Sequence, residues 1–442
     1  MNAYALFPDL RKVGLKIACG QNHRKIETNI IEVFPSMGRQ TIHGFGGALT
    51  HASGYVLNRM DKSLADEVIG KYYAPDGAGY RYVRIPLDSC DFSPTTFNAA
   101  VSLDAVSRDE YDFSKDEEFI FPWLDAICRA SRTNVPILLS PWSPPAFMKD
   151  NGSRLHGGHL LEAMKPYWAE YIARYVREYR TRGYNVWGLT IQNEPNAVQK
   201  WDSCLYTAEE ERNFFLGYLK PELDRTGLGD LKVFFWDHNK ERLLDRAGIF
   251  LEGEAERCVA GVAFHGYCGD HFRALELYRE MHPQHRMILS EFCMGYGDRY
   301  DYAKQLAVYG HEFIGDLASG ADTLFDWNLI LDHTGGPNHV GNYCMAPVMT
   351  DEKFRPKYTM AFGVLSTLAS LIKSGGEVVE HSSFAKDLDI VAVVDQEGSI
   401  HMVIGAAGAD REVNVRVGER IFTFPIHAGT LSVFELEKDD YE

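Results

Sequence analysis

Residues 135–194 begin with the apolar run VPILLSPW (135–142), continue through a helical pattern at 161–182 and end with a second apolar run, NVWGLTIQNE (185–194). Both runs stay almost free of charged residues until their ends, which is typical of parallel strands buried on both faces. A strand, a helix and a second strand in this order predict one β-α-β unit.

Six further runs repeat this pattern: QTIHGFGGA (40–48), YRYVRIPL (80–87), KVFFWDHN (232–239), GVAFHGY (261–267), RMILSEF (286–292) and TLFDWNL (323–329). Helical patterns lie between them, at 302–318, at 357–373 and from the capping box of Thr207 and Glu210 to about Asp224. Eight strands with intervening helices predict an α/β fold, a (β/α)8 TIM barrel, over residues 39–375. The segment GFGGAL (44–49) lacks the last glycine of a dinucleotide-binding loop and is predicted to make a tight turn at the first strand.

The two ends of the chain have a different pattern. Residues 376–442 show no helical period and instead alternate apolar and polar residues between Gly and Asp turns, and residues 13–35 look the same. We therefore predict a side β-sandwich built from both termini, with residues 1–38 and 376–442 as its two parts.

Composition excludes several classes of partner. The 442 residues carry a net charge of −17, and no long Lys/Arg run offers a site for nucleic acid or an anionic membrane. No stretch of 18 apolar residues could insert into a membrane, and the N-terminus has no secretory signal pattern. The eight cysteines are scattered singly, which predicts reduced, buried thiols and favours a cytoplasmic protein. The oligomeric state stays open.

Two predicted strands end in a glutamate, Glu194 after the fourth and Glu291 after the seventh. Active sites of (β/α)8 enzymes lie at these carboxyl ends. Hydrolysis of a glycosidic bond requires two carboxyl groups, one to protonate the departing oxygen and one to attack or to activate water. A single strand-end glutamate is as well explained by a structural ion pair, but two of them across one barrel favour glycoside hydrolysis.

Six segments are specific strings in a fixed order: HGFGGALTHA (43–52), RIPLDSCDFS (84–93), LLSPWSPPAFMKDNG (138–152), LTIQNEPNAVQ (189–199), ILSEFCMG (288–295) and FDWNLILDHTGGPNHVGN (325–342). Through them the chain resembles glycoside hydrolase family 30, the family of lysosomal glucosylceramidase and of microbial β-glucosidases, β-1,6-glucanases and xylanases. The resemblance spans essentially the whole chain. It implies a barrel with a side sandwich and hydrolysis with retention of the anomeric configuration.

The resemblance makes Glu194 the acid/base and Glu291 the nucleophile. An acid must hold its proton near neutral pH, so we expect burial and the negative Glu291 to raise the pKa of Glu194. Glu291 must be ionised, so we expect donors such as the Tyr267 hydroxyl to hold it.

Further side chains are expected to bind the sugar. Asn193 is placed to hydrogen-bond the 2-hydroxyl, and Asp91 can accept from two adjacent hydroxyls. The other expected substrate-binding residues are Trp142 through its indole N–H, Trp327 through its ring face, Asn342 at the pocket rim, and Tyr267, His265 and Trp201.

Some residues keep two interpretations. Trp201 is either simply exposed or lines the subsite beyond the cleavage point, and Arg84 either orients a carboxylate or forms a structural ion pair. Two departures from the family, His51 after GGALT and Gly266 between His265 and Tyr267, are expected near the sugar-binding rim.

We expect neither a metal nor an organic cofactor. His265, Cys268 and His271 are spaced like metal ligands, but no clear fourth ligand accompanies them. Cys293, beside the predicted nucleophile, has no evident activating base and is expected to be a packing residue.

The leading hypothesis is a retaining exo-β-glycosidase, a β-glucosidase or glucosylceramidase-like enzyme, acting on β-linked glucosides through a glycosyl-enzyme intermediate on Glu291. One alternative is an endo-β-1,6-glucanase, β-xylosidase or xylanase on the same residues. A different class of alternative is a non-catalytic carbohydrate-binding protein, against which two intact carboxylates argue.

Overall fold

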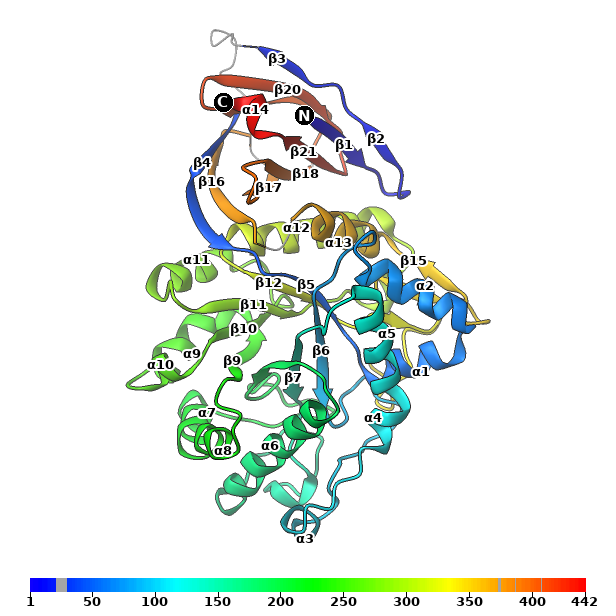
Figure 1. Cartoon of the computed structure of the whole chain (residues 1–442), viewed down its shortest axis with the longest axis vertical. Coiled ribbons are helices and arrows are strands. Elements are labelled where there is room, and N and C mark those ends of the chain that lie inside the picture. The colour runs from blue at the N-terminus through cyan, green and yellow to red at the C-terminus, as the bar shows by residue number, and fades with distance from the viewer. Residues whose placement is uncertain (21–29, 373–374, 386, 407) are drawn as a thin grey trace.

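Eight parallel strands close into a barrel, so the predicted TIM barrel is confirmed in the computed structural model, which describes residues 1–20, 30–372, 375–385, 387–406 and 408–442 (Figure 1). Each strand pairs with the next along the chain, and the last pairs with the first. In order they are β5 (Gly44–Ala48), β6 (Tyr82–Leu87), β7 (Ile137–Pro141), β8 (Val186–Thr190), β9 (Lys232–Asn239), β10 (Gly261–His265), β11 (Arg286–Glu291) and β12 (Thr323–Asp326).

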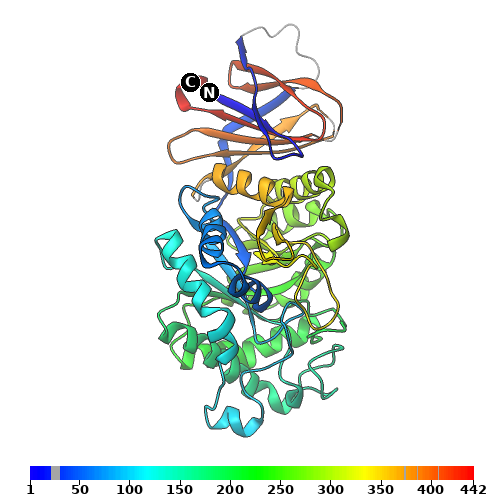
Figure 2. The same ribbon diagram turned by 90° about the vertical axis from the view of Figure 1, so that its right-hand side faces the viewer.

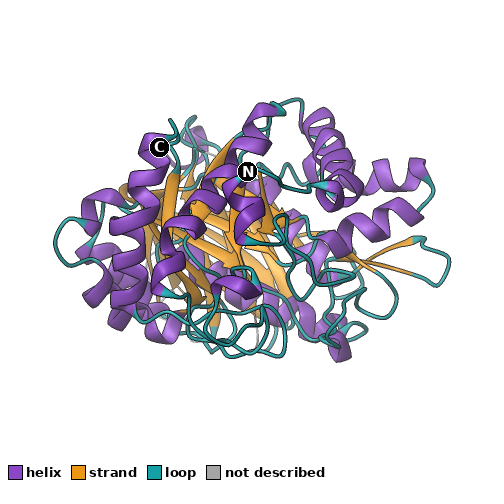
Figure 3. Ribbon diagram, turned by 90° about the horizontal axis from the view of Figure 1, so that it is seen from below, coloured by secondary structure: helices purple, strands orange, loops and turns teal. Residues whose placement is uncertain are grey.

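Helices surround the barrel strands, as the view from below shows (Figure 3). The helix predicted at 161–182 is α6 (Lys165–Thr181), and the capping box of Thr207 and Glu210 opens α7 (Ala208–Phe214) as predicted. The other helices are α1 (His51–Arg59), α2 (Lys62–Tyr73), α3 (Leu103–Ser107), α4 (Ser114–Phe119), α5 (Phe121–Ser131), α8 (Lys220–Arg225), α9 (Leu243–Phe250), α10 (Ala255–Cys258), α11 (Phe272–Met281), α12 (Tyr302–Ala318), α13 (Met360–Leu371) and the short C-terminal α14 (Lys438–Tyr441).

The glycines of β5 do not form the predicted turn. They lie in an extended strand, where a side chain would have no room. A Cβ on Gly46 would lie 2.6 Å from the Tyr82 carbonyl oxygen. A Cβ on Gly47 would lie 2.4 Å from the Leu329 side chain. These glycines therefore let the neighbouring strand and loop approach closely.

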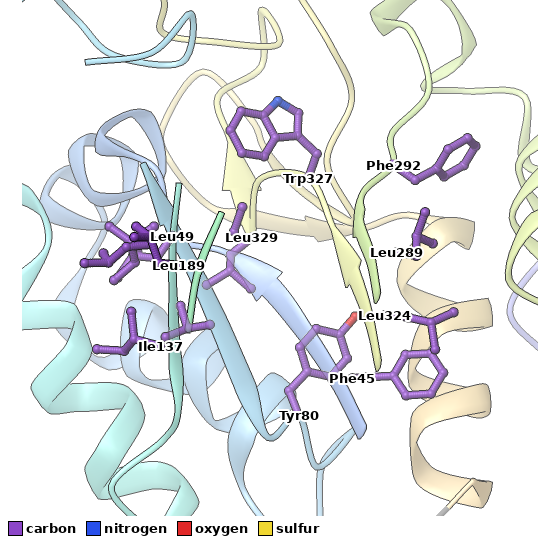
Figure 4. Close-up of a cluster of buried hydrophobic side chains, with 14 of the residues drawn as sticks. Phe45, Leu49, Tyr80, Ile137, Leu189, Leu289, Phe292, Leu324, Trp327 and Leu329 are labelled. Carbon is purple, nitrogen blue, oxygen red and sulfur yellow. The ribbon is translucent and has the colours of Figure 1, made fainter. Parts of the chain in front are cut away.

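Side chains fill the inside of the barrel, so it is a packed core and not a pore. One interior cluster is formed by residues from six strands: Tyr82, Leu138, Phe234, Ala263, Ile288 and Phe325. The main cluster lies between strands and helices, where Phe45, Leu289 and Leu324 pack together (Figure 4). Each fully buried side chain of this kind contributes about 1.5–3 kcal/mol. This packing fixes the strand ends on which polar residues stand.

A second sheet contains strands from both ends of the chain, so the predicted side β-domain is confirmed as one curled, mixed ten-stranded sheet (Figures 1 and 2). Helix α12 packs against three of its strands, β17, β18 and β21. In spatial order the strands are β2 (Lys12–Gly14), β1 (Asn2–Leu6), β21 (Thr430–Leu436), β18 (Ile400–Ala406), β17 (Leu388–Val394), β16 (Glu377–Ser383), β4 (Ile30–Thr41), β19 (Arg411–Val417), β20 (Arg420–Ile426) and β3 (Ala18–Gly20). The domain limits at residues 38 and 375 stay predictions.

A small third sheet lies beyond the last barrel strand and consists of β13 (Ile330–Leu331), β14 (Val348–Thr350) and β15 (Pro356–Tyr358). Among the helices in the described ranges, none has the length and apolar character needed to cross a bilayer.

Candidate active site

A cavity of about 370 Å³ opens where the barrel strands end. Nine of the side chains predicted to act on or bind a sugar line it: Asp91, Trp142, Asn193, Glu194, Trp201, Tyr267, Glu291, Trp327 and Asn342. They come from segments up to 251 residues apart in the chain, as the hydrogen bond between Asp91 and Asn342 shows. The barrel therefore collects these residues into one site.

Arg84 on β6 is the centre of a buried charge network. Its Nη1 donates to Oε2 of Glu291 at 2.5 Å, and its Nη2 donates to Asp237 and to Oδ1 of Asn193, both at 2.9 Å. The arginine is 0% exposed, and a buried guanidinium requires such partners. Both interpretations of Arg84 are thus correct, because one side chain orients a carboxylate and forms a structural ion pair.

Glu291 has two donors and a crowded negative environment. The Tyr267 hydroxyl donates to Oε1 at 3.0 Å, while Arg84 holds Oε2. Burial raises the pKa of Glu291, and the charge of Glu194 adds to this, whereas His265 and Arg84 act in the opposite direction. The net direction is upward, because burial is the largest of these effects.

Glu194 faces two histidines. Its Oε1 lies 3.5 Å from Nδ1 of His265 and 3.9 Å from Nε2 of His238. Nε2 of His265 in turn contacts Oδ1 of Asp237 at 3.1 Å, so Asp237, His265 and Glu194 form a chain. The structure places His265 behind Glu194, fully buried, rather than in the cavity wall.

The expectation of a raised pKa for Glu194 is wrong. Burial alone would raise the pKa of Glu194, but the contact with His265 and the charges of both histidines lower it below its ordinary value. Burial alone would lower the pKa of His265, but Glu291, Asp237 and Glu194 raise it to about 9. These opposite directions favour the proton on the imidazole next to Glu194.

The expected sugar-binding amides have defined orientations. Since Arg84 can only donate, Oδ1 of Asn193 faces it and the Nδ2 donors are left for the cavity. The Nδ2 of Asn342 donates to Oδ2 of Asp91 at 2.8 Å, so Asn342 also positions that carboxyl group. Burial and the charge of Glu291 raise the pKa of Asp91 to about 8, so this group can donate as well as accept.

Trp142 and Trp327 form an aromatic wall. Their rings stack at 5.3 Å between centroids with planes 20° apart, and the Arg84 guanidinium lies 4.9 Å from the Trp142 ring and 5.5 Å from that of Trp327. Trp201 is half-buried and lines the same cavity. The site thus offers apolar faces beside its carboxylates, the combination that pyranose rings require.

The backbone at the strand ends is unusual. Glu194 has φ 47°, and Trp236 and Asp237 have φ 74° and 48°. Such left-handed conformations are costly for residues other than glycine and persist where the surroundings fix them. Here the Glu211 side chain accepts from the Trp236 N–H at 2.9 Å, which braces the end of β9.

Two expectations about the rim are wrong. Among the described residues, neither His51 nor Gly266 lines the cavity. His51 is 0% exposed because its Nε2 pairs with Asp116 at 3.0 Å inside the helical layer. Gly266 faces away, toward Glu312, whose Oε1 would lie 2.0 Å from a Cβ at this position.

Several wall residues were not predicted as part of the site. His238 and Asn239 come from the end of β9, next to the buried Asp237, and Cys344 comes from the loop after β13. The remaining ones are Gln199, Cys293, Met294 and Gly295. The β9 residues could have been predicted, because the apolar run KVFFWDHN (232–239) ends in three polar residues at the end of a barrel strand. In the described part of the chain, no group of three or more His, Cys, Asp or Glu side chains is arranged to hold a metal ion.

Comparison with known proteins agrees with this geometry. Residues 42–364 match the sequence profile of the glycosyl hydrolase family 30 TIM-barrel domain. The crystal structure of SrfJ from Salmonella typhimurium is similar with a TM-score of 0.94, at 31% identity over 99% of each chain. The lysosomal acid glucosylceramidase of Mus musculus is 26% identical over 416 residues, 89% of this chain and 80% of the relative. An endo-1,6-β-D-glucanase of Neurospora crassa is 28% identical over 333 residues, 71% and 65% of the two chains.

Proposed function

This chain belongs to glycosyl hydrolase family 30, a family of retaining glycoside hydrolases, and we propose that it is an exo-acting β-glycosidase that releases glucose from β-linked glucosides. The observation that supports exo action is the cavity of about 370 Å³, at the small end of the range of about 300–1,000 Å³ for small-molecule sites. A cavity of this size suits one terminal sugar better than a bound polymer. The similarity to a glucosylceramidase supports glucose as that sugar.

In the first step Glu291 attacks the anomeric carbon and Glu194 protonates the departing oxygen. Arg84 and Tyr267 each donate to one oxygen of Glu291, so they favour its ionised form against the effect of burial and hold it in position. The glycosyl-enzyme intermediate that forms is an ester of Glu291.

The proton for the leaving group comes through the chain of Asp237, His265 and Glu194. Before substrate binds, the proton lies on His265, and the lowered pKa of Glu194 reflects that charge. A neutral sugar that covers the site removes water, and an ion pair without water is costly. Transfer of the proton from Nδ1 of His265 across 3.5 Å to Glu194 then gives two neutral groups.

In the second step Glu194 accepts a proton from water, which attacks the anomeric carbon and releases Glu291. The Nδ2 of Asn193 donates to the sugar 2-hydroxyl, a contact that strengthens as positive charge develops on the ring. Asp91 binds hydroxyls on the other side of the sugar, held by Asn342.

The experiment that tests exo action uses a β-1,6-linked gluco-oligosaccharide labelled at its reducing end. An exo-enzyme releases glucose from the start and shortens the labelled chain one unit at a time. Early appearance of labelled products from internal cleavage would instead identify an endo-glucanase, the activity printed for the Neurospora crassa relative. Hydrolysis of β-xylosides but not β-glucosides would contradict glucose as the sugar.

A further inference from the structure

Two cysteines from distant parts of the chain meet in the wall of the active-site cavity. Cys293 lies two residues after Glu291, and Cys344 lies in the loop that follows β13. The two segments run antiparallel: the N–H of Met345 donates to the Met294 carbonyl at 3.0 Å, and Gly295 pairs with Cys344. The backbone therefore fixes the two thiols relative to each other.

The two cysteine side chains lie on the same side of this pair of segments. Cys293 and Gly295 are two residues apart on one strand-like segment, so they face the same side, the side of Cys344. Gly295 has no side chain, and no atom lies within 4 Å of the place where its Cβ would be. Cys344 can therefore lean across to its diagonal neighbour, and the Cys344 thiol is the largest of the effects that raise the pKa of the Cys293 thiol.

The pair also touches the catalytic centre. The Sγ of Cys293 lies 3.6 Å from the Tyr267 hydroxyl, which donates to Glu291. A chemical change at Cys293 thus acts on a group that holds the predicted nucleophile.

The two thiols differ in access. Cys293 is 9% exposed, and the Cys344 thiol, burial and the charge of Glu291 raise the pKa of its own thiol, so it keeps its proton. Cys344 is half-buried and borders the cavity, so a reagent that enters the cavity meets it first. The expectation of eight buried thiols is right for three cysteines and wrong for the rest: Cys90, Cys204 and Cys293 are buried, Cys128, Cys258 and Cys344 are half-buried, and Cys19 and Cys268 are exposed.

We propose that Cys293 and Cys344 form a dithiol modification site, which a small-molecule disulfide such as oxidised glutathione converts to a protein disulfide that lowers glycosidase activity. The Cys344 thiolate attacks one sulfur of the reagent and releases one reduced glutathione. Cys293 then gives up its proton and attacks Cys344 sulfur, which releases the second. The protein dithiol is oxidised by two electrons, and one glutathione disulfide is reduced to two thiols.

A disulfide between Cys293 and Cys344 would weaken the contact between Tyr267 and Glu291. A disulfide brings the two neighbouring sulfurs to a bond of about 2.05 Å. Cys293 must turn toward Cys344 and away from Tyr267, whose hydrogen bond with Glu291 is disturbed. The loss of one hydrogen bond to a charged group corresponds to roughly tenfold or more in kcat/KM.

The test treats the full chain with oxidised glutathione, followed by intact mass measurement, peptide mapping and assay on a β-glucoside. Cys293→Ala and Cys344→Ser are compared with Cys258→Ser, which removes another half-buried thiol on α10. Each variant's untreated activity is its own reference. We expect a mass loss of two hydrogens, a peptide joining Cys293 to Cys344, and roughly tenfold lower kcat/KM that dithiothreitol restores.

The two pair variants should keep their untreated activity after oxidation, whereas Cys258→Ser should respond as the unaltered protein does. A glutathione adduct that stays on Cys344 without a bond to Cys293 would overturn the pairing. A mapped disulfide with unchanged activity would overturn its effect on catalysis. The effect on activity rests on the proposed glucosidase function, but the mapped disulfide does not. A protein that forms the disulfide and does not hydrolyse β-glucosides would contradict the glucosidase function alone, and an active protein without the disulfide would contradict this inference alone.

Discussion

Replacement of Tyr267 by phenylalanine removes one of the two donors that hold Glu291 and leaves the Arg84 contact in place. A hydrogen bond to a charged group contributes about 1.5–3 kcal/mol, and one pKa unit corresponds to about 1.36 kcal/mol. The pKa of Glu291 should therefore rise by about 1–2 units further above its already raised value. Because attack requires the ionised carboxylate, the acid side of the kcat/KM profile should move to higher pH by the same amount.

The assay is kcat/KM for 4-nitrophenyl β-glucoside as a function of pH, since this leaving group needs no protonation by Glu194. Tyr343→Phe is the matched control, because Tyr343 is 49% exposed and its hydroxyl holds no catalytic group. An acid limb that stays in place in Tyr267→Phe, or moves to lower pH, would refute the role of this hydrogen bond.

Three further predictions concern the acid, a titrating contact and a packing constraint. Glu194→Gln should lose roughly 10²–10⁴-fold in rate on poor leaving groups but much less in the glycosylation step with nitrophenyl glycosides, and equal losses would reject its role as acid. The hydrogen bond with Asp389 raises the pKa of His311 to about 9. The contact between the two side chains therefore stabilises the fold fully below the unfolded-state pKa of histidine, about 6.5, and this contribution is lost as the pH rises through about 9. The difference in unfolding free energy between the protein and His311→Gln, measured with urea, should shrink accordingly, and a difference independent of pH would contradict this. Gly266→Ala should cost about 1–3 kcal/mol because its Cβ meets the Glu312 carboxylate. Measured in a Glu312→Ala background, which loses its own ion pair with Lys240, the same substitution should cost much less. A free energy of unfolding that Gly266→Ala leaves unchanged would contradict this prediction, because the surrounding side chains would then make room for the methyl group at no cost.

The barrel could be predicted because its strands are short apolar runs in a regular alternation with helices. The capping box of Thr207 and Glu210 was readable for the same reason, since both of its partners lie within one helical turn. Glu194 and Glu291 could be predicted as a pair, because each directly follows an apolar run and strands four and seven lie across the barrel.

Other parts of the site depend on contacts that no local pattern encodes. The role of Asp237 arises from Arg84, 153 residues away, and from the imidazole of His265. The lowered pKa of Glu194 depends on the same imidazole. Composition and strand position therefore could not predict whether this pKa is raised or lowered. His51 was misplaced because its partner Asp116, 65 residues away in the chain, is a buried carboxylate in the first turn of α4.

The central claim, that Glu291 is the nucleophile of a retaining β-glucosidase, is tested most directly by incubation with 2-deoxy-2-fluoro-β-glucosyl fluoride. Intact mass measurement and peptide mapping then locate any stable glycosyl ester, with Glu291→Ala as the unlabelled control. The account predicts one fluoroglucosyl group per chain, on Glu291. An adduct on another residue, or no adduct in a preparation that hydrolyses β-glucosides, would contradict it.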